Sequence, residues 1–427
     1  MSLFDVSDRI DFTRRHKPDF LIMIYMGILM MLGLVVIYAI GPQRANVLNS
    51  AYGSNYSETY FFIKQIISML LSMVAFAAAA LIPYALQSKY AGKTVLISLG
   101  ACALLAVAGW ANLGIAQKTL GATRWFNLGI FGSLQPSEML KFAVLIFSAG
   151  LLGYRSRQGK VNDMQQTIIP LAILLAVALL FIVVIQKDLG TGVSLIGIVS
   201  AMLFVSGINK KNGLKIAAAI LAAGSIFIIS APHRVERVLT FLKGDNTSSS
   251  TSDSSSYHIE QAKLAIGSGG LFGVGIGNSV QATGYLPEAI NDSVFAIMGE
   301  TFGFVGSVII LIIFIAMLIR LLKIMDHLPD PNMKLFVAGV FGWFGAHVIL
   351  NIASMLGVFP LTGITLPLLS FGGTSMLFIA AALGVVFQLS HYTVFSSNLK
   401  EASYESSSSR GRVGRTRYAR RSSFTRS

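Results

Sequence analysis

The sequence predicts an all-α membrane protein that crosses the bilayer about ten times. Of its 427 residues, 54% are hydrophobic and only 12% are charged, whereas a soluble domain usually has roughly 25% charged residues. So little charge cannot cover a water-exposed surface of this size. Apolar runs recur along the whole chain and have about the 20 residues that a membrane-spanning helix needs. The basic residues gather between alternate runs, as they do in cytoplasmic loops.

Ten apolar runs are the expected transmembrane helices. The first run follows the basic residues Arg14, Arg15 and Lys17, and no small-residue cleavage site comes soon after it. We therefore expect a retained helix and not a cleaved signal peptide. In chain order the runs are 20–40, 60–82, 93–110, 137–153, 167–185, 190–207, 214–231, 293–319, 335–356 and 373–392.

The Lys and Arg asymmetry predicts that both termini are cytoplasmic. The chain then divides into a cytoplasmic segment 1–19, a membrane domain 20–392 with a large outer loop 232–292, and a basic, Ser-rich tail 393–427. We expect the tail to be disordered near anionic lipid head groups, with a dock for a specific partner as the alternative. The net charge of +14 therefore does not indicate nucleic-acid binding.

The single cysteine, Cys102, lies in an apolar run. One cysteine allows no intrachain disulfide, and its apolar surroundings disfavour a thiolate metal site or a cysteine nucleophile.

The first polar cluster joins the segments 121–125 and 135–141. Pro136 suits a first helical turn, and Glu138 and Lys141 are three residues apart on one helix face, where they can form an ion pair. This pair either fixes helix packing or forms a polar wall that faces a cavity.

Two further clusters carry charge near the outer side. The segment 186–192 interrupts two apolar runs, and Asp188 could cap the helix that follows. Arg234 and Arg237 are three residues apart and could grip a diphosphate in bidentate fashion. The alternative is that these two arginines are solvated surface charges.

The segment 261–277 begins with Gln261 and Lys263 and is rich in glycine. It lacks the Gly-Lys-Ser/Thr ending of a Walker loop and no strand precedes it, so a nucleotide site is excluded. We expect its glycines to let the backbone approach a lipid head group.

Two more clusters lie at the starts of expected helices, one at the helix 293–319 and one at the helix 373–392. In the segment 285–296, Glu288 and Asp292 stand just before a long apolar helix, where Asn291 or Asp292 could simply be an N-cap. The segment 361–375 is rich in small and hydroxyl residues and includes Ser370 and Thr374. Because these clusters fall on or near the outer side, one outer-facing site could collect them all.

Together the motifs resemble the SEDS family of shape, elongation, division and sporulation proteins, the family of FtsW and RodA. The match covers most of residues 20–392. The pieces that carry it are 121–125, 135–141, 188–191, 234–237, 261–270, 286–292 and 366–375.

The resemblance implies a ten-helix peptidoglycan glycosyltransferase that uses lipid II and works with a class B penicillin-binding protein and other division or elongation proteins. It implies that Asp292 is the essential carboxylate. A divalent cation, Mg²⁺ or Mn²⁺, is a possible cofactor, whereas no organic cofactor is expected. The residues expected to bind the substrate are Glu138, Lys141, Arg234, Arg237, Gln261, Lys263, Glu288, Ser370 and Thr374.

The chain departs from the family pattern at a few positions. Lys187 stands where the family usually has proline, His347 where glutamine is common, and Phe371 where tyrosine is usual; the Phe-Leu-Asp-Pro stretch is reduced to residues 241–245. None of these positions is Asp292, so they bear on the subfamily, for which the division branch is favoured over the elongation branch, and not on the chemistry. A lipid II flippase and a non-catalytic division scaffold remain the alternative functions.

Overall fold

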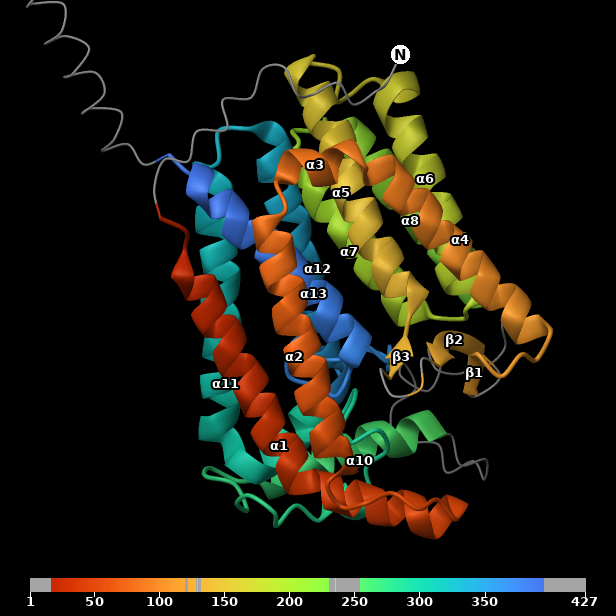
Figure 1. The fold of residues 1–427 in the computed structure, drawn as a ribbon, viewed down its shortest axis with the longest axis vertical. Helices are drawn as coiled ribbons and strands as arrows, with labels where there is room; N and C mark the ends of the chain where they lie inside the picture. Colours follow the sequence, from red (N-terminus) through yellow and green to blue (C-terminus); the bar gives the residue numbers. More distant parts are fainter. Residues whose placement is uncertain are drawn as a thin grey trace, which may run out of the picture.

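The computed structural model is a bundle of long helices that run roughly alongside one another (Figure 1). It describes residues 17–394 except 120–121, 128, 130–131, 230–234 and 236–253. Within these residues, eight helices are long and apolar enough to cross a membrane. The predicted class, an all-α polytopic membrane protein, is confirmed.

The described elements have the following bounds. The α-helices are α1 (Phe20–Tyr52), α2 (Tyr60–Leu81), α3 (Tyr84–Lys89), α4 (Ala91–Trp110), α5 (Pro136–Arg157), α6 (Ile169–Leu179), α7 (Leu189–Val205), α8 (Lys210–Ile229), α10 (Ser254–Ser268), α11 (Val294–His327), α12 (Pro331–Met355) and α13 (Gly373–Leu389). Short π or 3-10 helices are η2 (Met164–Ile168), η3 (Leu180–Ile185), η5 (Gln281–Thr283) and η6 (Ser390–Tyr392). The strands are β1 (Ala116–Thr119), β2 (Ala122–Asn127) and β3 (Ser133–Leu134).

Each of the ten predicted spans coincides with a helix of the structure. The largest difference is in α1, which continues to Tyr52 although its apolar run was expected to end at residue 40. Pro42 lies inside this helix, and the last turns of the helix lie across the end of the bundle (Figure 1). Proline has no N–H to donate and crowds the preceding turn, so it bends the helix without ending it.

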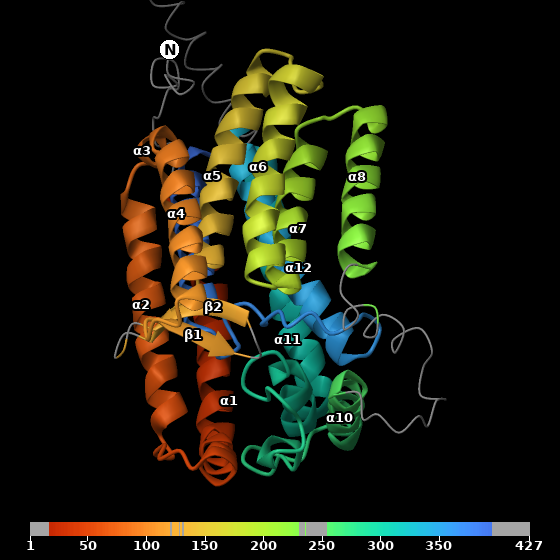
Figure 2. The same ribbon diagram turned by 90° about the vertical axis from the view of Figure 1, so that its right-hand side faces the viewer.

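Two segments between the expected helices contain regular structure. Segment 111–136 holds a small antiparallel sheet in the order β1-β2-β3, in which Ala116 pairs with Phe126 and Phe126 with Leu134. Within loop 232–292, α10 lies beside the start of α11 (Figure 2). Both elements are short and polar, so they lack the long apolar period that identified the spans.

Helix α12 lies in the centre of the bundle, where it packs against α5, α7 and α11, while α2 packs along α13. Small residues allow α7 and α12 to come close together: a Cβ added at Gly342 would lie 2.7 Å from the carbonyl oxygen of Gly197. Such small-residue contacts are typical of helices that associate in a membrane.

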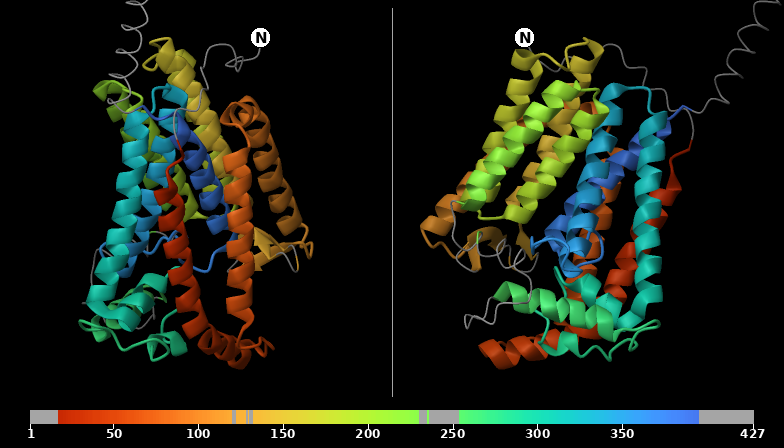
Figure 3. Two further views of the ribbon diagram at one scale, coloured as in Figure 1. Left: turned by 60° about the vertical axis from the view of Figure 1, so that its left-hand side comes forward. Right: turned by 180° about the vertical axis from the view of Figure 1, so that it is seen from behind.

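Both described ends of the chain lie at one end of the bundle. The backbone N–H of Asp19 donates to Ser390 Oγ at 2.8 Å, and that of Val394 donates to the carbonyl of His327 at 2.8 Å. The strands, α10 and the start of α11 lie at the opposite end (Figure 3). This second end is the one that carries the predicted polar clusters.

Candidate functional site

Asp292 stands two residues before α11 and does not cap it. The N-cap position is Ser293, whose side chain makes no capping hydrogen bond; its hydroxyl instead donates to the carbonyl of Pro287 at 2.8 Å. Asn351 of α12 donates from Nδ2 to the backbone carbonyl of Asp292 at 2.7 Å. The capping explanation for Asp292 is therefore wrong, and a neighbouring helix holds this residue through its backbone.

The carboxylate of Asp292 is available for chemistry. It is half-buried, and among the described residues no donor hydrogen-bonds to its oxygens. Burial, together with the negative charges of Glu288 and Asp188, raises the pKa of Asp292 to about 7, against the smaller opposing effect of the Arg124 guanidinium. A carboxyl group with a pKa near the ambient pH is suited to accept a proton from a hydroxyl group.

The segments 285–296 and 361–375 are joined beside this carboxylate. Asn351 Nδ2 also donates to the carbonyl of Ile364 at 2.7 Å, and the backbone N–H of Phe371 donates to the carbonyl of Ile290 at 2.8 Å. A Cβ added at Gly363, where φ is +69°, would lie 3.4 Å from Asp292 Oδ2. The backbone at Gly363 therefore forms one wall beside the carboxylate.

Asp188 has the structural role that its position suggested. It is the N-cap of α7, where its Oδ1 accepts from the backbone N–H of Thr191 at 3.0 Å. Its Oδ2 accepts from Thr191 Oγ1 at 2.8 Å and from Gln135 Nε2 at 2.9 Å. Asp188 thus ties the start of α7 to the start of α5 and adds negative charge near Asp292.

Arg124 brings a cation to the same place from strand β2. Its Nε donates to the carbonyl of Gln186 at 3.2 Å, and its Nη2 donates to the carbonyl of Lys187 at 2.7 Å. These two bonds fix the guanidinium between the small sheet and the turn before α7. A guanidinium has five N–H donors, so Arg124 can still donate to an anionic ligand.

Glu138 and Lys141 form the predicted ion pair. Lys141 Nζ lies 2.8 Å from Glu138 Oε1, and the side chains are 0% and 3% exposed, for lysine and glutamate respectively. Lys141 Nζ also donates to Ser194 Oγ of α7 at 3.2 Å. The pair therefore connects α5 to α7 inside the bundle, where neither side chain reaches the surface.

The same lysine reaches α12. Its Nζ lies 3.3 Å from His347 Nε2 and 4.8 Å from the centre of the Trp343 ring. Trp343 Nε1 also donates to His347 Nε2 at 3.2 Å, so the other ring nitrogen carries the proton, and Nδ1 donates to the carbonyl of Thr365 at 3.2 Å. Through His347, the buried pair supports the loop that passes Asp292.

Of the residues expected to bind the substrate, Glu288 is the nearest to Asp292 in the sequence. It adopts φ +50°, its side chain is 47% exposed, and Arg44 of α1 lies 3.6 Å from it. Its charge acts on Asp292 electrostatically, which places it at the site.

Ser370 and Thr374 hold backbone segments. Ser370 Oγ accepts from the backbone N–H of Leu366 at 2.8 Å inside its own loop. Thr374 Oγ1 donates to the carbonyl of Ser133 at 2.6 Å and accepts from the backbone N–H of Gln135 at 3.3 Å. Thr374 therefore joins the start of α13 to the start of α5.

Gln261 and Lys263 lie on α10, and the exposed Lys263 packs beside Gly357. Two glycines of the segment after them pack against protein: a Cβ would lie 2.0 Å from the carbonyl oxygen of Gly299 at Gly269, and 2.2 Å from that of Thr301 at Gly273. Close backbone packing against α11, which is kinked at Gly303 with φ +68°, explains these two glycines, and the approach of the others to a lipid head group stays a prediction. Arg234 and Arg237 lie outside the described residues.

The structure adds three side chains that sequence reasoning did not select. Asn351 holds Asp292 as described above, and its signal was a polar residue four positions after His347 on the same helix face. His258 Nε2 lies 2.6 Å from Ser293 Oγ and donates to it, because that hydroxyl donates elsewhere. The buried Glu300 accepts from Ser279 Oγ and the backbone N–H of Val280, which fixes the loop before η5.

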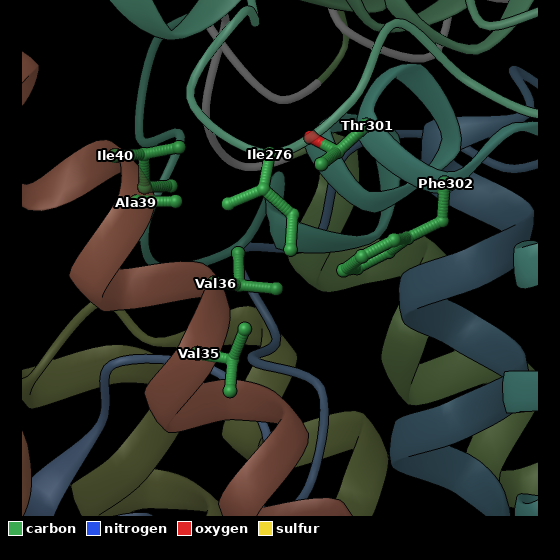
Figure 4. Close-up of a pocket in the computed structure, with 7 residues that line it drawn as sticks. All are labelled: Val35, Val36, Ala39, Ile40, Ile276, Thr301 and Phe302. Atoms are coloured by element: carbon green, nitrogen blue, oxygen red, sulfur yellow. The ribbon is translucent and has the colours of Figure 1, made fainter.

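A crevice elsewhere at this end is apolar. It lies between Val35, Val36, Ala39 and Ile40 of α1 and a facing set of three residues, Ile276, Thr301 and Phe302 (Figure 4). No ionisable side chain lines it, so it offers no partner to a charged head group.

Comparisons with known proteins agree with this geometry. The family model FTSW_RODA_SPOVE, described as cell cycle protein, matches residues 19–394. Stage V sporulation protein E of Bacillus subtilis is 30% identical over 89% of this chain and 99% of its own length. The probable peptidoglycan glycosyltransferase FtsW of Aliivibrio salmonicida is 31% identical over 91% of both chains.

Solved structures share the fold. A chain from a structure described as structural coordination of polymerization and crosslinking by a peptidoglycan synthase complex has a TM-score of 0.67 and 24% identity, over 87% of this chain and 97% of that one. Rod shape determining protein RodA of Thermus thermophilus has a TM-score of 0.60 and 24% identity, over 89% of this chain and 98% of that one.

Proposed function

The chain belongs to the FtsW/RodA/SpoVE family of cell cycle proteins, and from this we propose that it is a peptidoglycan glycosyltransferase that polymerises lipid II at the outer face of the cytoplasmic membrane. Relatives named as probable peptidoglycan glycosyltransferases support this activity. The two SEDS branches for division and for elongation both fit these relatives and structures.

In the proposed reaction, a hydroxyl group of the acceptor sugar attacks the anomeric carbon of the donor. The new glycosidic bond forms as the bond from that carbon to the diphosphate oxygen breaks, and polyprenyl diphosphate leaves. Asp292 takes the hydroxyl proton as general base. Because both substrates carry lipid tails, this site at one end of a membrane bundle meets them where their head groups lie.

The observation that carries this proposal is the state of Asp292. Its oxygens accept no hydrogen bond from the described residues, its pKa is raised to about 7, and Asn351 holds its backbone. A carboxylate kept for structure would be paired or would cap a helix, as Asp188 does.

Negative charge that develops on the leaving diphosphate needs cations. Arg124 is the described candidate, because its backbone contacts leave N–H donors available. Arg234 and Arg237 remain candidates from the sequence, as do Gln261 and Lys263 on α10.

A divalent cation bound to the diphosphate would find few ligands in this part of the chain. No three His, Cys, Asp or Glu residues gather as a metal site among the described residues, and both oxygens of Asp188 already accept hydrogen bonds. Asp292 is a described carboxylate near Arg124 whose oxygens accept no hydrogen bond from the described residues. One carboxylate fits Mg²⁺, which usually keeps waters and takes its other ligands from the phosphates.

We further propose a class B penicillin-binding protein as the partner, which would cross-link the strands that this chain polymerises. A structural relative described as part of a complex that coordinates polymerization and crosslinking supports this pairing. The location of both termini in the cytoplasm rests on the Lys and Arg asymmetry and on the positions of the two ends at one side of the bundle.

Purified protein given lipid II in detergent tests the activity, with and without the transpeptidase partner. Formation of glycan polymer is expected, and it requires no membrane to cross. A flippase would bind lipid II and form no polymer. A scaffold would also be inactive and would function in cells without Asp292, which separates it from both other functions.

A further inference from the structure

A second polar cavity lies far from Asp292, at the opposite end of α11. It has a volume of about 390 Å³ and lies where α1 begins and where α11 and α13 end. Because a helix rises about 1.5 Å per residue, and Arg320 is the first residue of α11 that lines the cavity, this cavity lies roughly 40 Å along the helix from Asp292. The cavity is therefore distinct from the proposed catalytic site.

The lining of the cavity is basic. Lys17, Arg320, Lys323 and His327 line it, and Asp19 is the acidic residue among the described lining residues. The cavity thus offers more positive than negative charge.

Both oxygens of the Asp19 carboxylate already have partners within the protein. Its Oδ1 accepts from the backbone N–H of Leu21 at 3.1 Å as the N-cap of α1, and its Oδ2 forms an ion pair with Arg320. The exposed Lys323 lies one turn further along α11 and has no acidic partner among the described residues. Its charge is available to an anion in the cavity.

Apolar side chains continue from this basic lining onto the lipid-facing surface. Phe20 and Ile24 line the cavity and are 50% and 47% exposed. Both belong to the first turns of a membrane-spanning helix. A ligand here would therefore meet cations at its polar end and hydrocarbon beside it.

We propose that this cavity binds the phosphate group of an anionic membrane phospholipid, whose acyl chain lies along the first turns of α1. Basic pockets between helices on the cytoplasmic side are a common form of lipid head-group site. The apolar wall favours a lipid over free inorganic phosphate, which would gain nothing from Phe20 and Ile24. The lipid would link the start of α1 to the end of α11, the helix whose other end follows Asp292.

Native mass spectrometry of the full chain tests this proposal. The protein in detergent is titrated separately with phosphatidylglycerol, phosphatidylcholine and inorganic phosphate. The fraction of protein that carries each ligand is measured. We expect one tightly held phosphatidylglycerol and weaker retention of phosphatidylcholine, whose choline offsets its phosphate charge. Lys323→Gln should weaken phosphatidylglycerol binding by about tenfold, as expected for the loss of one charge-assisted contact, and Lys323→Glu should weaken it further.

Lys89→Gln is the matched control, because Lys89 is an exposed lysine at the end of α3, outside the cavity. It should leave lipid binding unchanged. Equal retention of the two lipids, or equal loss in the Lys89 and Lys323 variants, would overturn the proposal. Displacement of phosphatidylglycerol by inorganic phosphate alone would assign the cavity to a soluble anion and would also overturn it.

Discussion

Asn351 donates one side-chain N–H to the backbone carbonyl of Asp292 and the other to that of Ile364, each at 2.7 Å. One amide on the central helix α12 therefore holds two segments that are about seventy residues apart in the chain. The carboxylate of Asp292 remains unengaged while its backbone is fixed. This arrangement orients a reactive group without using its oxygens.

Asn351→Leu tests this clamp. Leucine has a similar volume and no donors, so both carbonyls lose their partner at a cost of about 1–3 kcal/mol each if they stay buried. We expect the rate of lipid II polymerisation to fall by about 10²-fold, because small misplacements of catalytic groups are costly. Ser354→Ala, which removes a hydrogen bond to Pro360 one turn away, should keep most activity. Equal rates in the parent and Asn351→Leu would remove Asn351 from the site.

The pH dependence of polymerisation should report the ionisation of Asp292. A general base must be deprotonated, and the pKa of Asp292 is raised to about 7. The rate should therefore be low at pH 6 and rise through pH 7 towards pH 8. Initial rates at limiting lipid II across this range give the midpoint for the free enzyme.

Glu288→Gln should move that midpoint to lower pH. The negative charge of Glu288 disfavours the ionised form of Asp292 and so raises its pKa; removing that charge lowers the pKa, and the active form then persists in more acidic solution. Weaker substrate binding would change the rate at every pH and leave the midpoint in place. A midpoint that stayed fixed or moved to higher pH would contradict the electrostatic explanation.

The buried pair Glu138 and Lys141 should behave as one unit. Lys141→Met leaves Glu138 as a buried charge without its partner, and Glu138→Gln does the same to Lys141, so each change should destabilise the protein by about 3–5 kcal/mol. The double variant should lose much less than the sum. Thermal unfolding in detergent of all four proteins gives the coupling free energy, and strictly additive losses would show that the pair is not coupled.

The sidedness of the bundle can be read from cysteine labelling on a Cys102→Ser background. Ser268 is exposed at the end of α10, and Lys89 is exposed at the end of α3. We expect an impermeant maleimide to label Ser268→Cys in intact spheroplasts and Lys89→Cys only after lysis. The reverse pattern would invert the predicted topology.

Most of the fold could be predicted from the sequence because it depends on local patterns. Each span is a run of apolar residues with its own length and flanking charges, and all ten coincide with helices. The Glu138–Lys141 pair was predictable for the same reason, since both residues lie on one helix face. The Asp188 cap also depends on a contact three residues away.

The parts of the site that were not predicted depend on contacts between distant segments. Asn351 reaches Asp292 across 59 positions, and Arg124 reaches Lys187 across 63. A single sequence has no periodicity that reports such pairs. The close packing of Gly269 and Gly273 against the backbone of α11 was not predicted for the same reason.

Asp292→Asn is the most informative single change. Asparagine keeps the shape of the side chain and the backbone carbonyl that Asn351 binds, but an amide cannot take the hydroxyl proton, so polymerisation should fall by about 10²–10⁴-fold. Folding should not suffer: Asp292 caps nothing, and its raised pKa means that its ionised form is disfavoured in the folded protein, so the variant should be at least as stable at pH 8. Asp326→Asn, at the exposed far end of the same helix, is the matched control and should polymerise lipid II normally. If Asp292→Asn matched it in rate, Asp292 would not be the base, and a flippase or scaffold would become the better explanation.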